Sequence, residues 1–235
     1  MLSKKKLNIL GIIPARSGSK RLPKKNELKI GGISLLERSI TAAKKSKYIN
    51  RLIFSTESIE YIKLVKNLDI EVPFVRPDSL AKDNSSSWDV VRHAVSFMAD
   101  NKKFIADIVV LLQPNCPFRT TKHIDDVIDI VLSGANSALS IKKVDYPLEW
   151  MFRIDREGTL KNIIKNENVN RMQDSQVTYQ PNGAVYALKT TLLKNKLPMP
   201  NNGTRTLEMD FEESINIDEY WDYELAKIIY KRKYD

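Results

Sequence analysis

The chain has 235 residues, of which 42% are hydrophobic and 29% charged, and this composition excludes a disordered or low-complexity protein. Its single cysteine, Cys116, excludes an internal disulfide and a cysteine-based zinc cluster, and we expect it to be buried and inert. The net charge of +9 fits a nucleic-acid-binding protein, an enzyme with polyanionic substrates, or a lysine-rich composition without a functional role.

The first predicted element is a short buried strand over residues 7–13, which are mostly apolar. This run is too short for a membrane span or a signal peptide, and it ends at Pro14. We therefore expect a cytoplasmic protein that does not bind membranes.

A loop of small and basic residues follows the strand. Ser17-Gly18-Ser19 allows backbone N–H groups to approach an anion closely. The basic side chains around it add positive charge: Arg16, Lys20, Arg21, Lys24 and Lys25. Neither a GxxxxGK[ST] loop nor a GxGxxG motif is present, which excludes two common nucleotide motifs. The loop predicts a phosphate site at the carboxyl end of the strand, and the alternative is a solvated basic loop.

Over residues 13–26, this loop closely resembles the signature loop of the acylneuraminate cytidylyltransferases. That family activates sialic acids and related nonulosonic acids as CMP-sugars, and further matches follow in the same order along nearly the whole chain. The resemblance implies a Rossmann-like nucleotidyltransferase fold, with one domain over residues 1–235. It also implies that the loop binds CTP through Ala15, Arg16, Ser19, Lys20, Lys25 and Asn26.

Strands and helices then alternate, which predicts an α/β protein with a mainly parallel central sheet and helices on both faces. The spacing of Ser34 and Glu37 predicts a capping box at the start of a helix. The expected elements are a helix with Leu36, Ile40 and Ala43 facing inward, a strand over 51–55, a helix with Ile62, Val65 and Leu68 on one side, and a strand over 70–75 near the sheet edge because of Pro73.

A further helix is predicted to begin near Ser86 or Ser87. By resemblance, Arg76 and Ser87 contact the cytidine portion of CTP. The alternative for Ser87 is a helix N-cap, and the two roles are compatible.

Residues 108–112 are continuously apolar, as expected for a central parallel strand, and they lead into a loop over 113–120. Ligands of open α/β sheets collect beyond the carboxyl ends of such strands. The loop resembles the family's L-Q-P-(T/S)-S-P-(L/F)-R element, which implies that Gln113 contacts the sugar. The alternative is that Gln113 only satisfies nearby backbone groups. A helix with Ile124, Val127, Ile128 and Val131 on one face follows.

The pattern changes after a predicted core strand over 137–141. Large apolar residues in a hairpin-like stretch, 150–154 and 160–164, interrupt the α/β alternation. The resemblance implies that residues 142–179 are a small β-rich dimerisation insertion that reaches over the active site of a neighbouring subunit. We therefore expect a homodimer.

Residues 179–188 predict a turn that leads into a strand and resemble the family's R-P-N-G-A-(I/V)-Y element. The resemblance implies that Gln180 and Asn182 bind the sugar. Sialic-acid members commonly have Arg where this chain has Gln180, so a bidentate clamp on the sugar carboxylate is missing. The expected sugar is therefore sialic acid or a relative such as legionaminic acid, with Arg171 as the candidate for the missing charge.

Residues 213–222 lead into a C-terminal helix that is expected to bury Leu225, Ile228 and Ile229. This element resembles the family's (D/N)-I-D-x-x-x-D segment, in which acidic side chains hold Mg²⁺. The resemblance implies Mg²⁺ on Asp218, with Asn216 as a weaker neutral oxygen donor. The alternative is that Asp218 caps the helix.

The implied reaction is attack by the anomeric hydroxyl of a nine-carbon keto sugar acid on the α-phosphorus of CTP, with loss of pyrophosphate. The predicted catalytic residues are Arg16, Lys20 and Asp218. One alternative is a cytidylyltransferase for 3-deoxy-octulosonate, and another is a non-catalytic basic module that binds nucleic acid on the same fold. We expect no nucleic-acid partner, because the basic residues are scattered and aromatic residues do not interleave with them.

Overall fold

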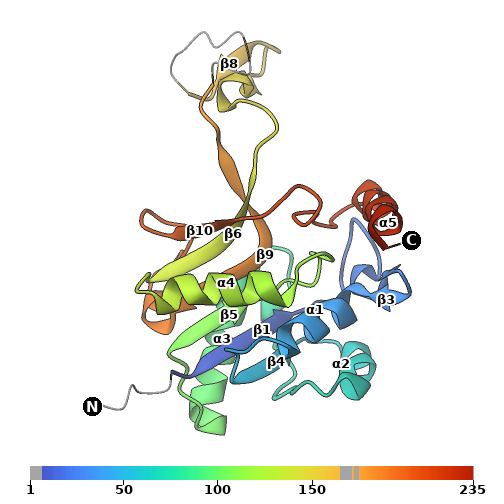
Figure 1. Cartoon of the computed structure of the whole chain (residues 1–235), viewed down its shortest axis with the longest axis vertical. Helices are drawn as coiled ribbons and strands as arrows, with labels where there is room; N and C mark the ends of the chain where they lie inside the picture. Colours follow the sequence, from blue (N-terminus) through green and yellow to red (C-terminus); the bar gives the residue numbers. More distant parts are fainter. Residues whose placement is uncertain (1–6, 165–170, 172–174, 235) are drawn as a thin grey trace.

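The computed structural model describes residues 7–164, 171 and 175–234 and contains a six-stranded central sheet (Figure 1). The strand order is β10-β6-β9-β5-β1-β4. These strands are β1 (Ile9–Pro14), β4 (Arg51–Ser55), β5 (Ile108–Leu111), β6 (Ser137–Lys143), β9 (Tyr179–Lys189) and β10 (Arg205–Glu208). Two small hairpins add β2 (Lys29–Ile30) with β3 (Ile33–Ser34), and β7 (Phe152–Ile154) with β8 (Leu160–Asn162).

The sheet is mainly parallel, as predicted. β1 pairs in parallel with β4 and β5, and β6 pairs in parallel with β10. β9 runs antiparallel between β5 and β6. Because β1, β4 and β5 point the same way, the loops that follow them meet at one edge of the sheet.

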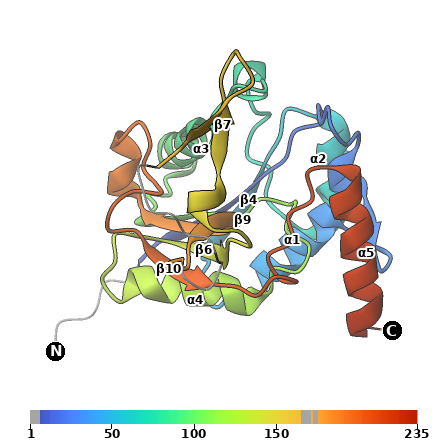
Figure 2. The ribbon, with the colours of Figure 1, turned by 90° about the horizontal axis from the view of Figure 1, so that it is seen from above.

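Helices cover both faces of the sheet, and the alternation of side chains along β1 explains how. Ile9 and Ile13 pack with the buried sides of α1, α2 and α4, whereas Leu10 and Ile12 pack with α3 on the other face. Figure 2 shows α3 and α4 on opposite sides of the sheet. The helices are α1 (Leu35–Lys44), α2 (Ile59–Val65), α3 (Ser87–Lys102), α4 (Thr121–Leu132) and α5 (Tyr220–Tyr234), and the 3-10 helices are η1 (Lys25–Glu27), η2 (Lys66–Leu68), η3 (Asp78–Leu80), η4 (Leu148–Trp150) and η6 (Thr190–Lys194).

The predicted start of α1 is confirmed, since the Ser34 hydroxyl accepts a hydrogen bond of 3.1 Å from the Glu37 N–H. This bond is the N-cap half of the predicted capping box, and the return bond from the Ser34 N–H to the Glu37 side chain is not formed among the described residues. At α3 the cap is Ser86, whose hydroxyl accepts from the Trp88 N–H at 3.2 Å. Ser87 is therefore the first helical residue and not the N-cap.

The predicted strand over 70–75 is wrong. Only Glu71 forms a β-bridge, with Ile53, and the chain then leaves the sheet. Pro73 has no N–H to donate to a strand ladder, which explains why pairing stops so early.

The C-terminal helix packs through a different face from the one predicted. Ala226 and Ile229 are buried, but Leu225 is 37% exposed and Ile228 is 65% exposed. The buried face of α5 packs against the β2–β3 hairpin and against Leu22 of the basic loop. This packing fixes the start of α5, and with it Asp218, beside that loop.

An arm leaves the sheet after β6 and returns at β9 (Figure 1), in the region of the predicted insertion over 142–179. The hairpin predicted there is confirmed as β7 paired with β8. All six of its strand residues are exposed, with Ile154 at 70% and Leu160 at 58%. The arm thus presents apolar side chains that nothing in the described chain covers.

Candidate active site

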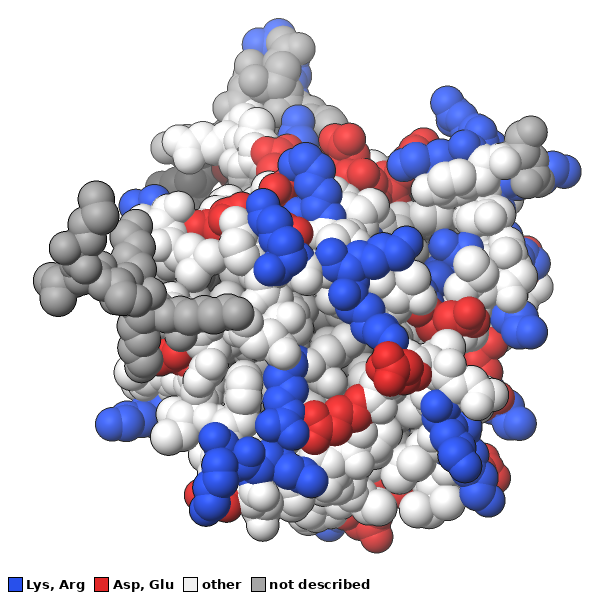
Figure 3. Space-filling view, turned by 60° about the horizontal axis from the view of Figure 1, so that its bottom comes forward, with Lys and Arg blue, Asp and Glu red and all other residues white. Residues whose placement is uncertain are grey.

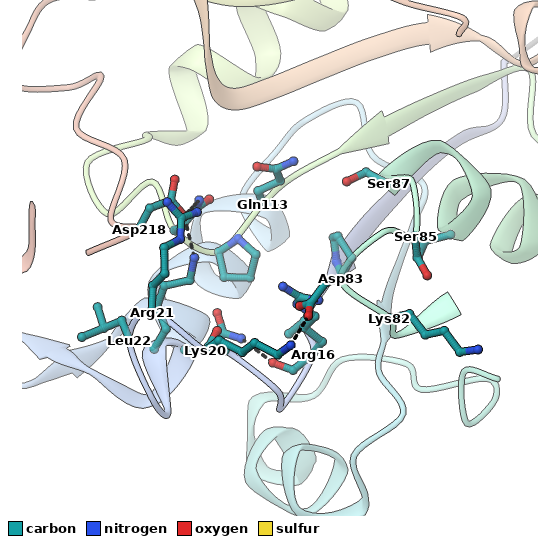
Figure 4. Close-up of a pocket in the computed structure, with 18 of the residues that line it drawn as sticks. Arg16, Lys20, Arg21, Leu22, Lys82, Asp83, Ser85, Ser87, Gln113 and Asp218 are labelled. Carbon is teal, nitrogen blue, oxygen red and sulfur yellow. Dashed lines mark hydrogen bonds and ion pairs between the residues drawn. The ribbon is translucent and has the colours of Figure 1, made fainter. Parts of the chain in front are cut away.

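A cavity of about 280 Å³ opens at the carboxyl ends of β1 and β5 (Figure 4). Its wall is formed by the basic loop after β1, the segment from Leu80 to Ser87, and Gln113-Pro114-Asn115 after β5. Asp218, just before α5, completes it. Four segments far apart in the sequence therefore converge at the edge of the sheet where ligands of open α/β folds bind.

All the residues predicted to bind the nucleotide line this one cavity. They are Ala15, Arg16, Ser19, Lys20, Lys25, Asn26, Arg76 and Ser87. Asn26 is buried, and its amide donates to the carbonyl of Arg16 at 3.4 Å, which ties the two ends of the basic loop together. Arg21, Leu22 and Lys82 also contribute to the lining.

Two of the predicted phosphate ligands share one carboxylate. Asp83 lies 2.8 Å from Nη1 of Arg16 and 2.6 Å from Nζ of Lys20 (Figure 4). The hydrogen bond from Lys20 and the charge of Arg16 lower the pKa of Asp83. The ion pairs hold the two cations on the same side of the cavity, and any phosphate that binds them competes with Asp83.

Lys25 and Asp218 form the second charged pair. Nζ of Lys25 lies 2.8 Å from Oδ1 of Asp218, and the Asn115 amide donates to the same oxygen at 3.4 Å. Burial tends to raise the pKa of Asp218, but the Lys25 ammonium outweighs it and the net effect is a lowered pKa. The contacts given for the Asp218 carboxylate are with Lys25 and Asn115 and not with an N–H group of α5. Asp222 instead accepts the N–H groups of Asp218 and Glu219 at 2.9 and 2.8 Å. The Asp218 carboxylate is thus directed at the basic loop.

Arg76 is buried at the base of the cavity and is held by Glu57. The distance from Nη2 of Arg76 to Oε2 of Glu57 is 2.6 Å, and Nη2 also donates to the carbonyl of Ala15 at 3.2 Å. Burial tends to raise the pKa of Glu57, but hydrogen bonds from Ser17 and Arg76 lower it overall. The carboxylate is therefore ionised in the neutral pH range.

Gln113 is the one predicted sugar ligand that lines the cavity. The backbone carbonyl of Gln113 accepts from the guanidinium of Arg119 at 2.8 Å, and Arg119 also donates to the backbone carbonyl of Ala184 at 2.7 Å. Burial lowers the pKa of Arg119 to about 10. A Cβ built on Gly183 would lie 3.3 Å from Oε1 of Gln113, so this glycine leaves the space in which the Gln113 amide sits.

The other predicted sugar ligands lie elsewhere in this chain. Asn182 is 3% exposed, and its amide is occupied by Ser140 and Ser214, which makes it part of the core rather than the cavity wall. Gln180 is exposed at the beginning of β9, where it pairs with Lys142 at the base of the arm. Arg171 is exposed and belongs to the arm. Neither lines the cavity of its own chain.

The two predicted metal ligands are also separated. Asp218 lines the cavity, whereas Asn216 does not. The Asn216 amide lies against Gly183, and its Oδ1 is buried without a hydrogen-bond partner. Among the described residues, no group of three or more His, Cys, Asp or Glu side chains could hold a metal ion without help from a ligand.

Sequence reasoning missed two acids, Glu57 and Asp83. A usable signal existed for Glu57, because it follows β4 by two residues and so reaches the same sheet edge as the basic loop. Asp83 stands in a polar segment without periodicity, and only the folded chain shows that it faces Arg16 and Lys20.

Cys116 is buried, as predicted, and its Sγ lies 3.6 Å from the carbonyl of Asn182. Burial raises the pKa of its thiol to about 11. A protonated thiol enclosed in the core is a poor nucleophile.

A mostly parallel sheet with a cation-rich cavity at its carboxyl edge defines an α/β protein built to bind an anionic ligand. Residues 10–228 match the family model described as Cytidylyltransferase, and the chain belongs to that family. The predicted family and fold are thereby confirmed.

Two relatives illustrate the similarity. The chain is 32% identical over 228 residues to an N-acylneuraminate cytidylyltransferase of Escherichia coli O18:K1:H7, which covers 96% of this chain and 52% of the relative. It is 30% identical over 227 residues to a CMP-N,N'-diacetyllegionaminic acid synthase of Legionella pneumophila, which covers 94% of this chain and 95% of the relative. The chain thus spans about half the length of the Escherichia coli relative.

A solved structure of CMP:2-keto-3-deoxy-manno-octonic acid synthetase complexed with CTP has the same fold. The TM-score is 0.67 at 16% identity, with coverage of 96% of this chain and 99% of that one.

On the face shown in Figure 3, the basic residues do not form one continuous surface. Figure 3 shows Lys and Arg side chains interspersed with Asp and Glu on the face viewed there. None of the described helices combines the length and the hydrophobicity that a membrane crossing requires.

Proposed function

We propose that this protein transfers a cytidylyl group from CTP to a nonulosonic acid and releases pyrophosphate. The observation that carries the proposal is that Arg16, Lys20, Lys25 and Asp218 line one cavity at the carboxyl edge of the sheet. The membership of the cytidylyltransferase family supports the choice of nucleotide. The names of both relatives support an acidic sugar as the acceptor.

In this reaction an oxygen–phosphorus bond forms between the anomeric hydroxyl and the α-phosphorus, and the bond to the β-phosphate oxygen breaks. Such a transfer mainly requires that the protein positions the reactants and neutralises charge. Arg16 and Lys20 would bind the triphosphate, and Lys25 would balance charge near the leaving pyrophosphate. Asn26, Arg76 and Ser87 would fix the rest of the nucleotide.

We propose Mg²⁺ as the cofactor, with Asp218 as its protein ligand. The carboxylate of Asp218 fits this role because it is ionised and lines the cavity, and Mg²⁺ is commonly held by one or two carboxylates together with substrate phosphates. When bound, the ion supplies positive charge to the triphosphate. Asn216 does not line the cavity, so Asp218 is the ligand that we assign to the ion.

We also propose a homodimer in which the arm covers the cavity of a second copy. The exposed apolar side chains of the β7–β8 hairpin support this, since such a surface is usually covered in a soluble protein. Arg171 and Gln180 would then approach the sugar bound to the other subunit. Sedimentation analysis tests the assembly, and Ile154→Asp should shift it to monomers.

The test of the activity is pyrophosphate release from CTP and Mg²⁺ with sialic, legionaminic, pseudaminic and 3-deoxy-octulosonic acids as acceptors. Release with one of the nine-carbon acids is expected, and Arg16→Ala should abolish it in a folded protein. Turnover with 3-deoxy-octulosonic acid alone would contradict the assigned sugar class. Salt-dependent nucleic-acid binding without CTP turnover would contradict the proposal as a whole.

A further inference from the structure

The carboxylate of Glu57 connects two parts of the cavity that are distant in sequence. Its Oε1 accepts the backbone N–H of Ser17 at 2.7 Å and the Ser17 hydroxyl at 3.0 Å. Its Oε2 accepts from Nη2 of Arg76 at 2.6 Å. One side chain therefore contacts both the basic loop and the buried arginine.

Both side chains of the Glu57–Arg76 pair are largely buried, so solvent does not replace either partner. The side chain of Glu57 is 12% exposed and that of Arg76 is 4% exposed. Nε of Arg76 is buried and has no hydrogen-bond partner among the described residues, so the guanidinium is oriented through Nη2 by Glu57 and the Ala15 carbonyl. A buried guanidinium that loses its only carboxylate partner in this arrangement would reorient.

We propose that Glu57 is a positioning residue for CTP, which holds the Ser17 amide and the Arg76 guanidinium in the arrangement that the nucleotide requires. The proposal rests on the proposed function, because CTP is the ligand concerned. Neither Glu57 nor Ser17 lines the cavity, whereas Arg76, Arg16 and Ser19 do. Glu57 therefore acts through the Arg76 guanidinium and through the backbone of the basic loop, and it is not catalytic.

The chemistry of the side chain gives a specific test. Both carboxylate oxygens of Glu57 accept hydrogen bonds, whereas glutamine has one accepting oxygen and one donating NH₂ group. In Glu57→Gln, the NH₂ group must therefore face either the Ser17 N–H or the Arg76 guanidinium. One of the two contacts is lost in either orientation of the amide.

The same strand offers a matched control. Arg51 and Glu71 form a two-pronged ion pair with distances of 2.7 and 2.8 Å. Arg51 begins β4, whereas Glu57 follows the end of that strand, so this pair lies at the edge of the sheet away from the cavity. Glu71→Gln breaks a pair of the same chemistry without touching Ser17 or Arg76.

The experiment measures CTP binding by calorimetry in the presence of Mg²⁺, together with the KM values for CTP and for the best acceptor sugar. Glu57→Gln should raise the Kd and KM for CTP by about tenfold or more, the effect of losing a hydrogen bond to a charged group. Its KM for the sugar should change by less than about twofold, since Gln113 does not contact Glu57. Glu71→Gln should change the Kd for CTP by less than about twofold.

A folded Glu57→Gln protein that binds CTP like the wild type would overturn the inference. An equal loss of CTP affinity in Glu71→Gln would overturn it as well. If Glu57→Gln does not fold, Ser17→Ala provides the second test, because it removes only the hydroxyl contact on an exposed residue. It should weaken CTP binding by about two- to fivefold, and an unchanged Kd would count against the inference. A wild-type protein that does not bind CTP would overturn the proposed function itself.

Discussion

Replacement of Gly183 by alanine tests whether Gln113 contacts the acceptor sugar. Gly183 has a φ of +79°, and a Cβ there would lie 3.3 Å from Oε1 of Gln113 and 3.4 Å from Nδ2 of Asn216. The left-handed backbone should cost about 1–2 kcal/mol of the free energy of unfolding. The close contacts should also displace the Gln113 amide by a few tenths of an ångström. A misplacement of 1 Å can cost about 100-fold in rate, so this shift should lower kcat/KM for the sugar by about three- to fivefold.

Gly32 supplies the control, because its φ is +80° and a Cβ there meets nothing within 4 Å. Gly32→Ala should therefore lower the free energy of unfolding by the same amount, about 1–2 kcal/mol, without a change in kcat/KM for the sugar. Urea unfolding measures the stability of both variants, and pyrophosphate release at saturating CTP measures the sugar dependence. Equal kcat/KM values for the sugar in the two variants would refute the role assigned to Gln113.

Three further predictions concern single side chains. Asp83→Asn should tighten CTP binding by about threefold or more in calorimetry, because Arg16 and Lys20 would no longer be paired with a competing carboxylate, and weaker binding would show instead that Asp83 positions them. Cys116 should resist alkylation at pH 8 until the protein unfolds, since a pKa of about 11 leaves only about one thiol in a thousand ionised, and rapid labelling of the native protein would contradict its burial. Glu57 has a lowered pKa in the folded state, so its ionised form contributes stability above the unfolded value near 4.5, and this contribution is lost as the pH falls through the folded value. The stability difference between wild type and Glu57→Gln, measured by urea unfolding, should thus be constant near neutral pH and shrink below about pH 4.5.

The parts of the fold that depend on local pattern could be predicted from the sequence. The apolar run of β1, the continuously apolar β5 and the Ser34 cap each carry a signal within a few residues, and all three form as expected. Residues 70–75 have a similar apolar content, but they do not form a strand, because Pro73 lacks an N–H and only Glu71 pairs with β4.

The orientation of α5 required tertiary information. Its apolar residues lie on more than one side, so periodicity alone did not identify the buried face. The β2–β3 hairpin selects that face, and the close approach of Gly31 to the Tyr230 ring shows how tightly the two pack. Leu225 and Ile228 are left at the surface as a consequence.

In the candidate site, too, some residues could be placed from local pattern and others depend on tertiary contacts. The residues predicted to bind the nucleotide could be placed together because loops after parallel strands meet at one edge, and the resemblance supplied the expected ligand class. The acids that contact these residues pair across long stretches of sequence, since Glu57 contacts Ser17 from 40 positions away and Asp83 contacts Arg16 across 67 positions. The position of Glu57 after β4 indicates the correct sheet edge, but no spacing rule identifies its partners. Asn182 was placed in the sugar site by its motif, but its amide is fully used in the core.

The location of charge explains more about function than its total does. Among the described residues, the cavity is lined by six basic side chains and two acidic ones, Asp83 and Asp218. Each acid is paired with a cation of the basic loop, and a clear positive excess remains. A concave site with such an excess attracts a compact polyanion more strongly than a flat surface with mixed charges does. Part of the net charge of +9 is therefore concentrated in the cavity, where it would attract a polyanionic ligand.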